Sequence, residues 1–202
     1  MPHAVMVPQL VLRNVRKVIT AGAGNCRVRV TVLGGVSLQL MPGEALAITG
    51  ALPLARSMLC AIAAGVARVN SGSVRWGPRG LTAVRYAPAG DAPRALQRRD
   101  ALPPGLVILD AALVERAPAA DVRAVAQLLE PWLRAGGAAL LAAPVTPRDW
   151  PWAILELTGG QLRPVFGGDA RQVPSWSAPA RMVAEGAVGF ECDRMAQGAP
   201  DQ

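Results

Sequence analysis

Three short, almost wholly apolar runs constrain the fold of this chain more than any other feature. They are EALAITG at 44–50, LVILD at 106–110 and AALLAAPV at 138–145. Such runs are typical of strands in the centre of a parallel sheet, because helices cover both faces of that sheet. Apolar residues at helical spacing follow the first run at 56–67 and the second at 120–135. Strands that alternate with helices predict an α/β domain of three layers around a mostly parallel sheet.

The N-terminal part is rich in β-branched residues, and we expect it to add further strands. The candidates are residues 9–20 and 26–40, which are broken at Gly34-Gly35. Shorter strands are expected within GSVRWG and LTAVRYA. The segment AILELTGGQLRPV predicts a hairpin that turns at Gly159-Gly160.

Each expected helix carries features that set its limits. One side of the first helix holds four apolar residues, Met58, Leu59, Ile62 and Val66. In the second helix, Asp121 suits the positive N-terminal end and Gly136-Gly137 suits the C-terminal end. Pro131 lies inside this helix and predicts a kink or an early stop.

The chain divides into one domain and a tail. Its 202 residues, 51% of them hydrophobic, are enough for one domain with a proper core. We expect residues 1–166 to form that core domain. Gly, Pro, Ser and polar residues then replace the periodic pattern, so residues 167–202 are expected to be irregular. Four apolar residues of the tail either form a docking segment or pack loosely, namely Trp176, Met182, Val183 and Phe190.

The formal net charge of +7 raises the question of a nucleic-acid or acidic membrane partner. Lys17 is the only lysine, and the arginines are scattered along the sequence apart from a small cluster at Arg94, Arg98 and Arg99. Together with abundant Ala, Gly and Pro, this composition fits a GC-rich coding bias. Aromatic residues make up only 4%, which disfavours a base-stacking surface. We therefore expect no nucleic-acid partner.

Cysteine usage and hydropathy indicate the compartment. Cys26, Cys60 and Cys192 are odd in number and far apart, so they fit neither a disulfide framework nor a zinc site. The N-terminus lacks the apolar core of a signal peptide, and no stretch is long enough for a transmembrane helix. We expect a cytoplasmic protein, either free or peripheral at the inner face of the membrane.

The segment that follows the first apolar run has the layout of a phosphate-binding loop. Such a loop needs a strand, a Gly-rich turn and a helix whose free N–H groups face the phosphates. Its usual form is G-x-x-x-x-G-K-[ST], in which the lysine reaches the outer phosphates and the hydroxyl holds magnesium. Here the strand leads into Gly50-Ala-Leu-Pro-Leu-Ala-Arg56-Ser57 and then a helix. Gly50, Arg56 and Ser57 are therefore candidates for binding nucleotide, and a strand–turn–helix junction with no ligand is the alternative.

The order and spacing of several segments resemble the ATP-binding-cassette (ABC) ATPases. Residues 32–77, from VLGGVSLQLMPGEALAITG to NSGSVRWG, are similar to the first core segment of that family without an insertion. LQRRDALPPGLVILD resembles the run into the Walker B strand, and ILELTGGQLRP resembles the hairpin that closes the core. The likeness covers roughly residues 9–165. It implies a P-loop NTPase core, ATP and magnesium as the family's ligands, and a transporter or other membrane complex as the partner.

The loop departs from the family's pattern at three positions. Arg56 stands at the lysine position, where its planar fork does not replace a compact ammonium in a tight cradle. Pro53 replaces a glycine and removes a backbone N–H. Ala55 replaces the last glycine, at a cost of roughly 1–2 kcal/mol if that position needs a positive φ. Ser57 alone is retained as a magnesium ligand.

Catalytic side chains are missing elsewhere. Asp110 ends the Walker B strand and suits magnesium bound through water, with capping of a helix or loop as the alternative. Ala111 follows where the family carries its catalytic glutamate. Ala89 stands at the Q-loop glutamine, and Pro144 or a neighbour stands at the switch histidine. Only residues 90–109 separate Ala89 from Asp110, which leaves no room for the helical subdomain with its L-S-G-G-Q signature. A domain of this kind cannot form the usual nucleotide sandwich or transporter-docking groove.

These departures predict a pseudo-ATPase with no catalytic residues, which acts as an interaction subunit for an ABC ATPase, a transporter or another membrane complex. A module that binds ATP or ADP weakly without hydrolysis, with Ser57 and Asp110 as a relic magnesium site, is the alternative. The ATPase half of a heterodimer is disfavoured, because the groups that position and stabilise phosphoryl transfer are lost together. In a further hypothesis, Arg56 pairs with Asp110 and fills the phosphate place, which would exclude nucleotide. We expect no bound cofactor.

Overall fold

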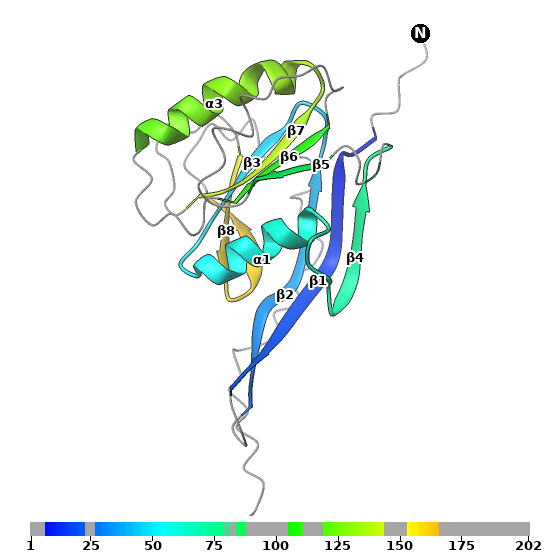
Figure 1. Ribbon diagram of the computed structural model, residues 1–202, viewed down its shortest axis with the longest axis vertical. Coiled ribbons are helices and arrows are strands. Elements are labelled where there is room, and N and C mark those ends of the chain that lie inside the picture. Colours follow the sequence, from blue (N-terminus) through cyan, green and yellow to red (C-terminus); the bar gives the residue numbers. More distant parts are fainter. Residues whose placement is uncertain are drawn as a thin grey trace, which may run out of the picture.

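The architecture comes from a computed structural model of the chain (Figure 1). The structure describes residues 7–22, 27–78, 80, 84–87, 105–110, 119–143 and 153–165. Several features singled out in the sequence lie outside these residues: Ala89, Ala111, Pro144, the segment 90–104, Cys26, Cys192 and the tail 167–202.

A six-stranded sheet forms the centre of the domain. Three of its strands are the predicted apolar runs, β3 (Ala45–Thr49), β6 (Leu106–Asp110) and β7 (Ala138–Ala142), and every residue in them is buried. The other three strands are β5 (Val84–Ala87), β8 (Ala153–Thr158) and β9 (Gln161–Pro164). The strand order is β5-β6-β7-β3-β8-β9, and all neighbours are parallel except β8 and β9. The prediction of a mostly parallel sheet is confirmed, as is the hairpin that turns at Gly159-Gly160.

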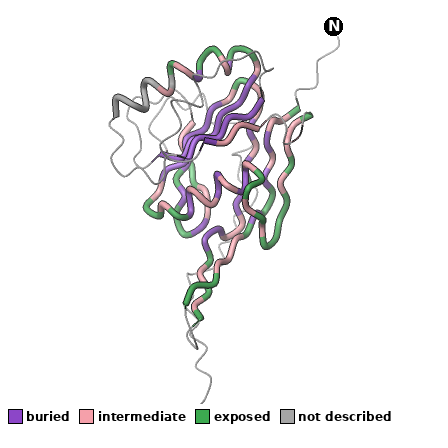
Figure 2. Tube along the Cα trace, viewed as in Figure 1, coloured by how far each residue is buried: buried purple, intermediate pink, exposed green. Residues whose placement is uncertain are grey.

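Each face of this sheet has its own apolar core. Successive side chains of a strand point to opposite faces, so Ile48 and its alternate neighbours pack on α1 (Pro53–Ala63). On the opposite face, Leu109 packs with Leu133 of α3 (Ala119–Arg134). Figure 1 shows the two helices on opposite sides of the sheet, and Figure 2 shows burial concentrated along the parallel strands. This arrangement is the predicted three-layer α/β core.

A second, antiparallel sheet packs on the same side of the core as α1. Its strands, in the order β2-β1-β4, are β1 (Leu10–Ala21), β2 (Val28–Leu40) and β4 (Ser71–Trp76). The predicted break at Gly34-Gly35 is wrong, because β2 runs through both glycines. The register shifts there instead, between the pairs Val15–Val36 and Arg16–Gly34. The glycines therefore accommodate a β-bulge, which bends a strand without ending it.

The helix boundaries differ from the predicted ones. The first helix begins three residues before the predicted start, with Pro53 at its first turn, and it ends at Ala63. Val66 lies beyond that end and is exposed, so its prediction as part of the apolar side of this helix is wrong. Cys60 is fully buried, as expected for a reduced core thiol. The second helix continues through Pro131 to Arg134, so the early stop predicted there is wrong.

Candidate functional site

The candidate site lies at the carboxyl edge of the parallel sheet. β3 ends at Thr49 and leads through Gly50 into α1, whereas β6 ends at Asp110. β7 separates these two strands in the sheet, and α1 packs across both β7 and β6. The start of the helix is therefore brought over the end of β6. Open α/β sheets bind their ligands in the crevice outside the carboxyl ends of the strands.

Gly50 is fixed by the backbone of the neighbouring strand. Its φ is +133°, and a Cβ at this position would lie 2.3 Å from the carbonyl oxygen of Leu157 in β8. No side chain fits at that distance, and the backbone conformation disfavours L-residues in any case. The glycine expected from the phosphate-loop pattern thus has a structural reason to be present, whether or not a ligand binds.

The backbone N–H groups that would face a phosphate are largely used or missing. Ala55 N and Arg56 N both donate to the carbonyl oxygen of Leu52, at 3.1 and 3.3 Å. Pro53 sits in the first turn of α1 and has no N–H to offer. A phosphate cradle depends on free N–H groups at the helix start. In the described structure, Pro53, Ala55 and Arg56 offer none, so this turn provides fewer free N–H groups than a phosphate cradle uses.

The loop surface is apolar where a phosphate site would be polar. Leu52 is 61% exposed and Leu54 is 50% exposed, and both belong to the few large exposed apolar residues of the described chain. No acidic side chain lies in the first turn of α1, and no side chain caps its N-terminus. Two adjacent exposed leucines of this kind suit contact with another apolar surface.

Arg56, at the family's lysine position, is buried. Its side chain is only 3% exposed, and its Nε makes no hydrogen bond among the described residues. Burial lowers the pKa of this guanidinium, whereas the nearby negative charge of Asp110 raises it again. A direct Arg56–Asp110 pair stays a prediction. The negative charge of Asp110 lies near enough to the buried guanidinium to favour its charged form.

Ser57 and Asp110 are brought together as predicted. Ser57 Oγ donates to Asp110 Oδ1 at 3.0 Å, although the two residues are 53 apart in sequence. Asp110 is only 3% exposed, so this hydrogen bond is shielded from water. Two magnesium ligands at right angles, each about 2.1 Å from the ion, would lie about 3 Å apart. The spacing of these two oxygens therefore fits a pair of neighbouring magnesium ligands.

Tyr86 completes this cluster and was not predicted. Its hydroxyl donates to Asp110 Oδ2 at 3.3 Å from β5, the strand next to β6. Burial, followed by the negative charge of Asp110, raises the pKa of Tyr86 to about 12, because both disfavour the tyrosinate. The sequence did contain a signal, since Tyr86 is the only tyrosine and stands near the end of the strand expected within LTAVRYA.

The residues present fit one half of a magnesium–nucleotide site only. The Ser57–Asp110 pair has the right chemistry and spacing for the metal, and nucleotide phosphates normally complete such a site. The loop that would hold those phosphates offers no free N–H at Pro53, Ala55 or Arg56 and keeps its cation buried. The described residues contain no cluster of three His, Cys, Asp or Glu side chains that could hold a metal without phosphate.

Comparisons with known proteins identify the fold. No family model and no curated protein matches the sequence. Among solved structures, a nucleotide-free ATP-binding cassette from an ABC transporter superposes with a TM-score of 0.57 at 10% identity, over 80% of this chain and 92% of that one. An ATP-binding subunit of an ABC transporter gives 0.55 at 16% identity, over 76% and 88%. A dimeric cassette bound to ADP and phosphate gives 0.54 at 14% identity, over 77% and 97%.

These similarities confirm the predicted resemblance at the level of the fold. The chain has the α/β architecture of ABC ATP-binding cassettes, with a mostly parallel sheet and a strand-rich N-terminal part that forms an antiparallel sheet. Identities of 10–16% establish shared architecture and leave activity to be argued from the site. None of the described helices is long and apolar enough to cross a membrane.

Proposed function

We propose that this chain is a pseudo-ATPase: an ABC-type domain that does not hydrolyse ATP and acts as an interaction subunit. The observation that carries the proposal is the loop at the start of α1. Two of its N–H groups, those of Ala55 and Arg56, donate to Leu52, and Pro53 has none, so these three positions do not donate to a phosphate. The positions of the catalytic glutamate, glutamine and histidine hold Ala111, Ala89 and Pro144 or a neighbour, none of which supports phosphoryl transfer.

The proposed partner is a protein of an ABC transporter or another membrane complex. Two of the similar structures are described as parts of ABC transporters, which motivates this class of partner. The short interval between Ala89 and Asp110 leaves no room for the helical subdomain that forms the family's usual docking groove. The exposed Leu52 and Leu54 offer a different contact surface at the loop.

Residues 1–166 form the proposed interaction domain, and residues 167–202 form a separate tail. We place the protein in the cytoplasm, peripheral to the inner face of the membrane.

A second candidate function is a module that senses nucleotide without turnover. The closeness of Ser57 Oγ and Asp110 Oδ1 favours it, because this pair has the spacing of magnesium ligands. A nucleotide would then bind mainly through its metal. The role of an ATPase half in a heterodimer would need a partner to supply every missing catalytic group, and no described feature favours it.

A phosphate-release assay on the purified chain tests the proposal. The matched control is Asp110→Asn, which keeps the side-chain shape but removes the carboxylate from the Ser57–Asp110 pair. We expect ATP and magnesium to give the same background rate with both proteins, since neither is an enzyme. Phosphate release by the wild-type chain that Asp110→Asn abolishes would refute the pseudo-ATPase assignment.

A further inference from the structure

The charges of this chain are divided unevenly along its length. Of its 14 acidic residues, Glu44 alone precedes Asp91. The antiparallel sheet β2-β1-β4 is built from residues 10–21, 28–40 and 71–76, so it contains no carboxylate side chain. Arginines that are scattered in the sequence are brought together when these strands pair. The basic surface is therefore a property of the fold and does not appear as a run of charges.

Strand pairing places four of these arginines on one face of the sheet. The inner face of β1 is buried against the core through Leu12 and Val15. Residues that alternate with these point outward, and cross-strand partners point the same way. Arg13 pairs with Ser73, and Arg75 pairs with Val11. The four outward-pointing members are all exposed, and we call them the outer arginine face: Arg13, Arg16, Arg29 and Arg75.

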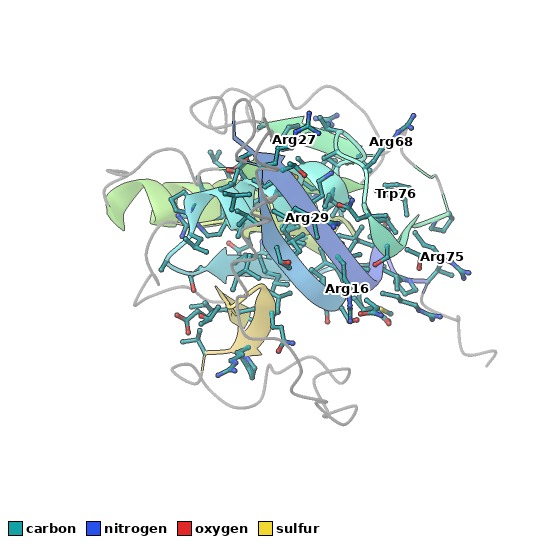
Figure 3. All side chains as sticks on the ribbon, turned by 90° about the horizontal axis from the view of Figure 1, so that it is seen from below. Arg16, Arg27, Arg29, Arg68, Arg75 and Trp76 are labelled. Atoms are coloured by element: carbon teal, nitrogen blue, oxygen red, sulfur yellow. The ribbon has the colours of Figure 1, made fainter. Side chains whose placement is uncertain are left out.

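The outer arginine face is long, and no carboxylate of the described residues forms an ion pair with it. Arg75 is opposite Val11 and Arg29 is opposite Thr20, so the face extends about 30 Å along β1. Figure 3 shows Arg16 and Arg75 extending from the same side of the sheet, while Arg27 and Arg68 lie at the opposite border of the view. The ion pair found among the described residues joins Arg134 to Glu130 in α3, far from this face in the chain.

We propose that the outer arginine face docks this protein on an anionic phospholipid bilayer. Each arginine held near an anionic membrane surface contributes attraction of about 1 kcal/mol, and a guanidinium binds phosphate in a bidentate manner. The arginines are distributed over an open face with Thr31, Ser37 and Ser73 exposed between them. A layer of headgroup phosphates complements such a surface over its whole length.

The composition of the face favours a bilayer over a nucleic acid. Proteins that bind single strands stack bases on exposed aromatic side chains, and none of the described outward-pointing residues is aromatic. Trp76 belongs to the inner side, where its indole Nε1 donates to the carbonyl oxygen of Ala63 at 2.7 Å. Arginine with short hydroxyl side chains reads phosphate without reading bases. This inference does not depend on the pseudo-ATPase proposal, because a nucleotide-binding chain could use the same face.

Vesicle co-sedimentation tests the inference. The full chain is mixed with vesicles of phosphatidylcholine alone, or of phosphatidylcholine and phosphatidylglycerol in equal parts. We expect binding to the anionic vesicles only, weakened by added salt. The R16Q/R75Q variant should lose about tenfold or more in partition coefficient. The matched control R134Q/R163Q removes the same charge from α3 and β9, outside the antiparallel sheet, and should bind within about twofold of wild type. Thermal melting verifies that both variants fold.

Three results would overturn the inference. Equal binding to neutral and anionic vesicles would show that charge is not involved. An equal loss in the R134Q/R163Q control would show that net charge, and not this face, is responsible. Tighter binding to duplex DNA or single-stranded RNA than to vesicles, lost in R16Q/R75Q, would assign the face to nucleic acid instead.

Discussion

The two halves of the candidate site differ in how much of the family's arrangement they keep. The phosphate half, from Gly50 to Ala55, depends on backbone N–H groups, and one proline together with a rearranged turn leaves few of them free. The metal half depends on the side chains of Ser57 and Asp110, and these still meet at 3.0 Å. A site built from backbone is lost when the local conformation changes. A site built from side chains survives as long as the strands that carry them stay in register.

The largest expected effect is on the phosphate half. Gly50→Ala should destabilise the fold by about 3 kcal/mol or more, because its Cβ would overlap the carbonyl oxygen of Leu157 at a φ that L-residues avoid. Gly136→Ala is the matched control: its φ is also positive, at +85°, but nothing lies within 4 Å of the added Cβ. It should cost only about 1 kcal/mol. Urea denaturation measures both. Equal costs would mean that the loop is not held against β8.

The next effect concerns the metal half. Asp110→Ala should cost about 3 kcal/mol, because Ser57 and Tyr86 lose a buried acceptor and the charge of Arg56 loses its compensation. Asp110→Asn keeps an oxygen that accepts from Ser57 and should cost less. The comparison is again made by urea denaturation. If Asp110→Ala is as stable as wild type, Asp110 does not organise this half of the site.

The pKa of Tyr86, measured from its absorbance, reports on the same cluster of Ser57, Tyr86 and Asp110. Its tyrosinate absorbance is unambiguous because the chain has one tyrosine, and we expect a titration midpoint of about 12. The folded-state pKa is above the ordinary value of about 10, so its contribution to stability is complete below about pH 10 and is lost as pH rises through the folded value.

The same titration has a built-in control. Asp110→Asn removes the second-largest cause of the shift and should bring the midpoint of Tyr86 back towards its ordinary value. A midpoint that does not move on this substitution would mean that the carboxylate does not contact Tyr86.

The smallest effect is expected for the hydroxyl of the pair. Ser57→Ala should cost about 1–1.5 kcal/mol, the usual worth of one hydrogen bond, because Tyr86 still donates to the same carboxylate. Thermal denaturation with Ser73→Ala, an exposed hydroxyl on β4, as the control measures the difference. A loss no larger than that of the control would show that the Ser57–Asp110 hydrogen bond does not form in solution.

Much of the fold followed from residue pattern alone. The strands β3, β6 and β7 are buried on both faces, so they are continuous apolar runs and are easily recognised in the sequence. The placement of Ser57 beside Asp110 followed from the resemblance to the ABC ATPases, in which these two positions share a magnesium site. The break predicted at Gly34-Gly35 was wrong because a pair of glycines is compatible both with the end of a strand and with a β-bulge inside it. Only the pairing with β1 decides between these outcomes.

Features that depend on contacts between distant segments could not be predicted. Tyr86 gains its role from strand pairing with β6, and the outer arginine face forms only when β1 and β4 align. The burial of Arg56 depends on how α1 packs on the sheet, and the sequence of the helix alone does not predict that packing. The hydrogen bonds of Ala55 N and Arg56 N to Leu52 likewise depend on the turn at the start of α1, where Pro53 lies.

Calorimetric titration of ATP with magnesium into the wild-type chain tests the central claim most directly. A variant with Pro53→Gly, Ala55→Gly and Arg56→Lys serves as the comparison, because it restores the glycines, the N–H group and the ammonium of the family's loop. We predict no saturable heat for the wild type at millimolar nucleotide, and measurable binding for the restored variant. Saturable binding of ATP to the wild-type chain would contradict the account, since it would mean that the loop accepts phosphate as it stands.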